Sequence, residues 1–101
     1  MPTTPANPSG RRALVTGGSG DIGAAICREL AAQGCAVHVH AHANMQRADA
    51  IVAEIRAAGG EAHAIAFDLT DGTATRAAIE ALLESGPIGV LVHNAGIHDD
   101  A

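Results

Sequence analysis

The sequence predicts an α/β protein with a parallel sheet in the strand order 3-2-1-4 and helices on both faces. Three observations support this fold class. Short apolar runs typical of strands alternate with longer stretches that have helical spacing, from residue 11 onward. The links between these stretches are short, and glycines follow the helical ones. Alternation of this kind indicates a parallel sheet, and right-handed crossovers place the first strand centrally.

The first half of the pattern contains two strands and two helices. Residues 13–15 form a short apolar run, and residues 21–33 have apolar side chains at helical spacing before Gly34 stops the helix. Residues 35–41 alternate between valine and histidine, as a strand does. The clearest helical stripe comes next and consists of Ala48, Ile51, Val52, Ile55 and Ala58.

The second half repeats the alternation. A glycine pair at 59–60 ends the second helix, and residues 61–67 are typical of a third strand. A third helix is expected over 73–84 and a fourth strand over 88–92. The sequence ends shortly afterwards, so we expect a sheet truncated after its fourth strand.

Composition excludes several classes of function. The net charge is −5 and one residue is aromatic, which argues against binding to nucleic acid. Apolar runs stay well short of the ~18 residues of a membrane span, so no membrane partner is expected.

Residues 1–10 contain three prolines and are expected to form a disordered leader. Cys27 and Cys35 lack the spacing of a disulfide framework, which favours reduced thiols and a cytoplasmic location.

A glycine-rich turn links the first strand to the first helix. It reads T-G-G-S-G-D-I-G over residues 16–23. Glycines permit a tight turn and close approach of the backbone, and the helix N-terminus offers free N–H groups to a phosphate. The loop alone fits a plain strand-to-helix turn equally well. Its candidate cofactor contacts are Gly17, Ser19, Gly20, Asp21, Ile22 and Gly23.

Two further motifs follow the third and fourth strands. Asp68-Leu69 and Asn94-Ala95-Gly96 both lie where a strand ends, which is where open α/β sheets bind ligands. With the glycine loop, these motifs resemble the short-chain dehydrogenase/reductase family over residues 11–101, and most of all its 3-oxoacyl-carrier-protein reductases. The resemblance implies that 11–101 is the N-terminal half of a dinucleotide-binding domain of the Rossmann type. It also implies that Asp68 caps the adenine pocket.

The resemblance implies NADPH-dependent reduction of a 3-oxoacyl-carrier-protein substrate, in fatty acid or polyketide biosynthesis, by a homo-oligomer. The family's catalytic Ser, Tyr and Lys mostly lie beyond the N-A-G motif, and this chain has neither Tyr nor Lys. We therefore assign no catalytic residue and expect the chain alone to be inactive. The alternatives are a non-catalytic nucleotide-binding or interaction module, and a fragment of an epimerase-like extended member of the family.

The glycine loop departs from the family pattern at one position. Asp21 stands where the short branch of the family has Gly, so the loop also fits the T-G-x-x-G-x-x-G spacing of the epimerase-like branch. The N-A-G motif favours the short branch. A carboxylate suits a helix N-terminus but would repel a nearby pyrophosphate, so the direction of the Asp21 side chain stays open.

The end of the second strand bears on the choice of cofactor. An acid about 20 residues past the glycines normally holds the ribose 2′-hydroxyl of NAD. Residues 41–44 contain no acid, which favours NADP over NAD, with Arg47 as the nearest cation. His38, His40 and His42 share one face of the strand. We interpret the first two as core residues and place His42 at the adenosine end of the cofactor, with no metal site.

Overall fold

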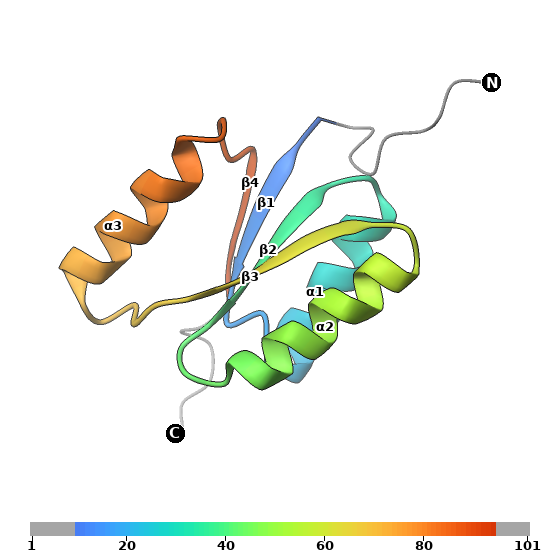
Figure 1. Cartoon of the computed structure of the whole chain (residues 1–101), viewed down its shortest axis with the longest axis horizontal. Helices are drawn as coiled ribbons and strands as arrows, with labels where there is room; N and C mark the ends of the chain where they lie inside the picture. Colours follow the sequence, from blue (N-terminus) through green and yellow to red (C-terminus); the bar gives the residue numbers. More distant parts are fainter. Residues whose placement is uncertain (1–9, 95–101) are drawn as a thin grey trace.

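The computed structural model describes residues 10–94. Strands and helices alternate along the chain (Figure 1), in the order β1 (Arg12–Thr16), α1 (Asp21–Ala32), β2 (Ala36–Ala41), α2 (Met45–Ala57), β3 (Glu61–Ala66), α3 (Gly72–Leu83) and β4 (Val90–His93). Every predicted element is present, with ends shifted by at most a few residues. The leader expected over 1–10 lies outside the described residues except for Gly10, and so do Ala95 and Gly96.

The four strands form one parallel sheet in the order β3-β2-β1-β4, which confirms the predicted topology. Its central strands, β1 and β2, are buried almost throughout. Helices α1 and α2 lie side by side on one face of the sheet, and α3 lies on the other (Figure 1). Because all strands point the same way, their four carboxyl ends gather along one edge. Thr16 is paired with His93 at that edge.

The core lies between the sheet and the α1–α2 layer. Small side chains dominate it, and each alanine removes far less apolar area from water than a leucine would. Cys27 and Cys35 are both buried and unpaired, as expected for packed small residues. Burial raises the pKa of the Cys27 thiol to about 12, which makes it unreactive in the folded chain. The buried cluster includes Val15, Ala24, Val37, Val39, Ile51 and Ile55.

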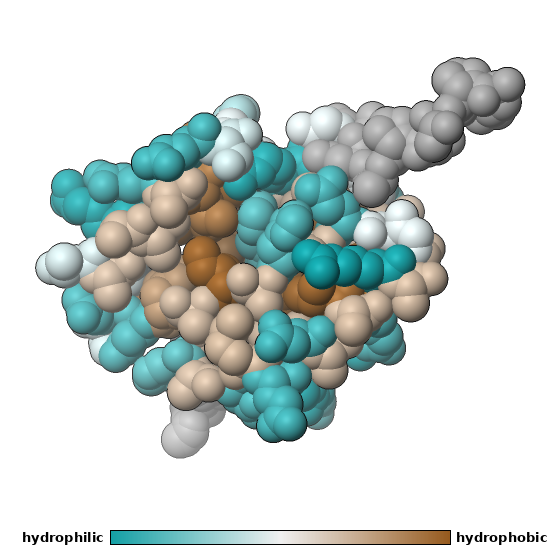
Figure 2. Space-filling view, viewed as in Figure 1, coloured by the Kyte–Doolittle hydropathy of each residue, from teal (hydrophilic) through white to brown (hydrophobic). Residues whose placement is uncertain are grey.

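The face of the sheet turned toward α3 is less completely covered. Leu82 is the one buried residue among the described residues of α3. Leu91 on β4 is 65% exposed, and Leu83 on α3 is also exposed. Figure 2 shows strongly apolar side chains reaching the surface between α3 and the strands.

A polar network crosses the amino half of the same face. The Arg12 guanidinium donates to the Gly86 carbonyl at 2.5 Å and to Nε2 of His38 at 3.2 Å. The His38 ring stacks on His63 with 5.4 Å between centroids. Desolvation, with Arg12 next, lowers the pKa of His38 to about 4, so this histidine stays neutral in the fold. Arg12 thus anchors the loop after α3 to the start of β1.

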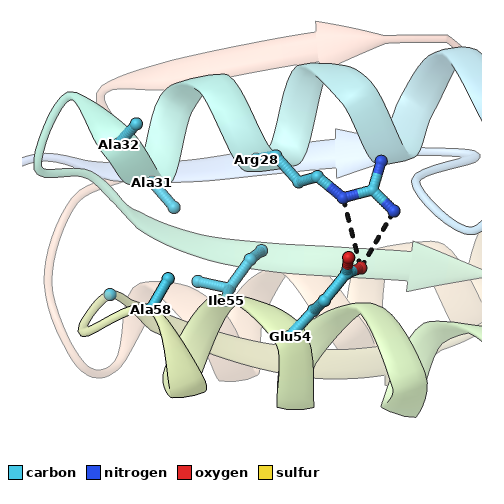
Figure 3. A pocket seen from close by; sticks show the side chains of 7 residues that line it. Arg28, Ala31, Ala32, Glu54, Ile55 and Ala58 are labelled. Atoms are coloured by element: carbon cyan, nitrogen blue, oxygen red, sulfur yellow. Dashed lines mark hydrogen bonds and ion pairs between the residues drawn. The ribbon is translucent and has the colours of Figure 1, made fainter.

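A cavity of about 270 Å³ opens between α1 and α2. Ala31 and Ala32 line it from α1, Ile55 and Ala58 line it from α2 and its end, and the Arg28–Glu54 ion pair, 2.9 Å long, spans the two helices beside it (Figure 3). Its lining comes from the C-terminal halves of both helices. These helices run antiparallel to the strands, so the cavity lies away from the carboxyl edge where the predicted site residues gather.

The neutral His38 predicts that the fold loses stability in mild acid. Unfolded histidine titrates near pH 6.5 and His38 near 4, so between these values the unfolded chain binds more protons. The free energy of unfolding should therefore fall as pH drops from about 6.5 to 4, by up to about 3 kcal/mol from this group. Urea unfolding at a series of pH values measures this change in the free energy of unfolding.

The variant His38→Gln keeps an acceptor for Arg12 but cannot titrate, so its stability should vary less over this pH range. Equal slopes for the parent and His38→Gln would contradict the neutral assignment of His38.

Candidate functional site

The glycine loop makes a tight turn directly after β1. Gly17 has φ +67°, in the left-handed region that favours glycine. Its carbonyl accepts a hydrogen bond from the Gly20 N–H at 3.1 Å, which closes the turn before α1 begins at Asp21. The local fold therefore follows from a glycine at 17 and a helix start four residues later.

Atoms pack closely against two other loop glycines. A Cβ at Gly23 would lie 2.2 Å from the Gly17 carbonyl oxygen, so the first turn of α1 rests directly on the loop backbone. A Cβ at Gly18 would meet the side chains of Val39 and Cys27 at 3.0 and 3.1 Å. Gly20 is different: its φ is −79°, and a Cβ there would meet nothing closer than 3.6 Å. The structure thus requires glycine at position 23, favours it at 17 through the positive φ, and leaves little space for a side chain at 18.

The N-terminus of α1 has no side-chain cap, unlike those of the other two helices. Asn44 accepts from the Arg47 N–H at the start of α2, and Asp71 accepts from the Ala74 N–H at the start of α3. A cap of this kind stabilises a helix by about 1 kcal/mol. The capping position of α1 is Gly20, which has no side chain. The N–H groups in the first turn of α1 are therefore available as hydrogen-bond donors to an anion.

Asp21 lies at this helix start, and its side chain turns toward α2. One carboxylate oxygen lies 2.6 Å from Nη2 of Arg47, and the Asp21 side chain is 92% exposed. This ion pair answers the question that the sequence left open. It also means that Arg47, the cation nearest to the end of β2, is already paired with a carboxylate. Next to it, the Ile22 side chain is exposed, and Ser19 in the loop is half-buried.

His42 and Asp68, which follow β2 and β3, lie close together. Nε2 of His42 is 3.7 Å from a carboxylate oxygen of Asp68. The other Asp68 oxygen accepts from the Thr70 hydroxyl and N–H, at 2.6 and 2.9 Å. These hydrogen bonds lower the pKa of Asp68, so it remains an acceptor over the physiological range. Leu69 beside it is half-buried.

Asn94 joins the end of β4 to the glycine loop. Its backbone N–H donates to the Thr16 hydroxyl at 3.0 Å, and its side-chain amide donates to the Gly17 carbonyl at 3.1 Å. The Thr16 hydroxyl also lies 3.1 Å from Nδ1 of His93. Asn94 thus braces the loop from the β4 side.

His40 contacts the same loop from β2. Its Nδ1 accepts from the Gly17 N–H at 3.0 Å, and its Nε2 lies 2.8 Å from the Phe67 carbonyl. The ring is buried, as the sequence predicts for a core residue. Burial lowers its pKa. Sequence reasoning missed the contact with Gly17, because a histidine in a strand gives no signal of which loop lies beside it.

The carboxyl edge therefore brings together donors for phosphate, a carboxylate acceptor and a short loop held from two strands. No three His, Cys, Asp or Glu side chains within residues 10–94 gather as a metal site would require. None of the helices in that range is long and apolar enough to cross a membrane. A parallel sheet in the order β3-β2-β1-β4, with a glycine turn and a helix directly after its first strand, is a fold of the Rossmann type.

The chain belongs to the short chain dehydrogenase family, whose model matches residues 11–101. An uncharacterized oxidoreductase of Methylorubrum extorquens is 42% identical over 91% of the chain. The 3-oxoacyl-(acyl-carrier-protein) reductase FabG of Staphylococcus aureus is 40% identical over 89%. A solved short chain dehydrogenase of Burkholderia cenocepacia in complex with NADP is 46% identical over 91% of this chain and 38% of its own, with a TM-score of 0.81.

These similarities cover one part of the relatives. The chain spans 38% of the M. extorquens protein and 37% of the S. aureus protein. Members of the family bind a nicotinamide dinucleotide.

The packing at Gly23 predicts a sharp contrast between two loop variants. Gly23→Ala should destabilise the fold by about 2 kcal/mol or more, because the new methyl group collides with the Gly17 backbone. The same variant should lose dinucleotide binding. Gly20→Ala should fold like the parent, since its φ is ordinary and the space is open. Urea unfolding and dinucleotide titration compare them. Equal losses in both variants would contradict this account of the loop.

Proposed function

We propose that this chain is the cofactor-binding part of an NADPH-dependent reductase of 3-oxoacyl groups carried on acyl carrier protein. The observation that carries the proposal is the uncapped start of α1 against the Gly17–Gly23 loop. The similarity to FabG supports the substrate class, and the NADP complex of the B. cenocepacia relative supports the cofactor. A role in fatty acid or polyketide synthesis, a cytoplasmic location and a homo-oligomeric enzyme belong to the same proposal.

Different residues of the carboxyl edge would contact different parts of the cofactor. The N–H groups of the loop and first helical turn, from Ser19 to Gly23, would hold the pyrophosphate. Asp68 and Leu69 would contact the adenine, with His42 beside the adenosine. Asn94, Ala95 and Gly96 would line the cofactor after β4. When bound, the dinucleotide supplies a hydride to the keto carbon, and the chain's own part is to bind and orient it.

Arg47 would have to provide the positive charge for the 2′-phosphate that distinguishes NADP. The segment after β2 carries no acid that would hold the 2′-hydroxyl of NAD. Arg47 is already paired with Asp21 at 2.6 Å, so a phosphate must compete with this carboxylate. Asp21 would thus weaken NADP binding in two ways: it occupies the cation and adds a like charge.

Removal of the Asp21 charge should therefore tighten NADP binding. Asp21→Asn or Asp21→Gly should increase affinity for NADPH by roughly 1 kcal/mol, about fivefold, with a smaller change for NADH, which lacks the 2′-phosphate. Fluorescence titration of both cofactors measures the difference. Asp49→Asn removes an equal charge from α2, where its side chain is exposed, and serves as the control. Unchanged NADPH affinity in the Asp21 variants would contradict the competition.

A binding module without turnover is the second candidate, and the composition favours it for the 101-residue polypeptide. The chain has no tyrosine to donate a proton to the keto oxygen and no lysine to lower that tyrosine's pKa. We expect the purified polypeptide to show no reductase activity with NADPH and a 3-oxoacyl thioester. Loss of NADPH absorbance provides the assay. Turnover above the uncatalysed rate would show that the catalytic groups lie within these residues.

A further inference from the structure

His40 is the most completely buried ionisable ring of the described chain, at 1% exposure. It sits on β2, one of the two central strands, and its neighbours come from both sides. The Gly17 N–H donates to Nδ1 at 3.0 Å, from the loop after β1. Nε2 lies 2.8 Å from the Phe67 carbonyl, just past the end of β3, and the Phe67 ring packs on the imidazole with 4.3 Å between centroids.

The two contacts together define the tautomer of the ring. A backbone N–H can only donate, so Nδ1 must be unprotonated toward Gly17. A carbonyl can only accept, so Nε2 must carry the proton toward Phe67. Only the neutral Nε2–H form satisfies both partners. A side chain that accepts on one side and donates on the other is what this place in the sheet requires.

The Gly17 peptide is held on all its polar atoms by this arrangement. Its N–H donates to His40, and its carbonyl accepts from the Gly20 N–H and the Asn94 side chain. Gly17 has no Cβ and a positive φ, so its own backbone preferences restrict it little. Its N–H, if left without an acceptor next to a buried strand, would be costly. The conformation of the loop therefore depends on contacts from neighbouring strands.

We propose that His40 is a positioning residue of the dinucleotide site: it holds the Gly17 N–H inward, and so sets the glycine loop in the conformation that receives the pyrophosphate. It acts through Gly17 and contacts no cofactor itself. The bond to Phe67 is the second half of this role, because it ties the loop to the segment that carries Asp68. The inference rests on the proposed function and adds a residue outside the family motifs described above.

Two amide substitutions separate the two halves of this role. In His40→Asn, the side-chain oxygen can occupy about the position of Nδ1 and accept from Gly17, while the donor to Phe67 is lost. In His40→Gln, the side-chain nitrogen can occupy about the position of Nε2 and donate to Phe67, while the acceptor for Gly17 is lost. Each variant loses one buried hydrogen bond, so they are matched controls for stability.

The first measurement is made on the 101-residue chain without cofactor. Nitrogen-15 shifts of the His40 ring should show the Nε2–H tautomer, and the Gly17 amide should exchange slowly with solvent. Protection of this amide should persist in His40→Asn and fall in His40→Gln, with similar urea midpoints for the two. Fast exchange of Gly17 in the parent, or equal protection in both variants, would overturn the proposal.

The second measurement is NADPH affinity by titration. His40→Gln should bind about tenfold more weakly than His40→Asn, the ratio expected when a buried donor loses its partner. Equal affinities in the two variants would overturn the positioning role. A parent chain that binds no dinucleotide, yet shows exchange protection of the Gly17 amide that depends on His40, would refute the proposed function. It would still support the hydrogen bond by which His40 positions the loop.

Discussion

The Gly17 peptide is the point on which the candidate site depends. Its N–H and carbonyl are held by β2, by the loop itself and by the residue after β4, and the first turn of α1 lies against its oxygen. Such packing leaves no room for a side chain at Gly23. The carboxyl edge is therefore organised as one unit, in which a shift of one strand would disturb the loop.

Charge is placed around this unit so that the start of α1 remains open to an anion. The two helices away from the loop carry Asn and Asp caps, whereas α1 begins at a glycine. The Asp21 carboxylate is the negative charge at the start of α1 and would compete with a bound anion there, but it lies against Arg47. An exposed ion pair of this kind contributes at most about 1 kcal/mol, so a ligand phosphate can displace it.

The two faces of the sheet are built differently. The face under α1 and α2 carries one cluster of buried, mostly small apolar side chains, and Cys27 belongs to it. The opposite face carries histidines and Arg12, with neutral rings satisfied by specific partners. Burying neutral histidines links the fold to pH, because each must stay unprotonated to keep its hydrogen bonds.

The sequence by itself determined the elements, their order and the parallel topology, because the strand and helix periods and the glycine stops are local signals. It also placed the candidate residues at strand ends, and Asp68, His42 and Asn94 do gather at that edge in the structure. Only the tertiary structure decided which glycines are required, where the Asp21 carboxylate turns and what His40 and Arg12 hold. These contacts join residues 23, 26 and 74 positions apart. They follow from the register of neighbouring strands and from how α1 and α2 pack together, which no local pattern encodes.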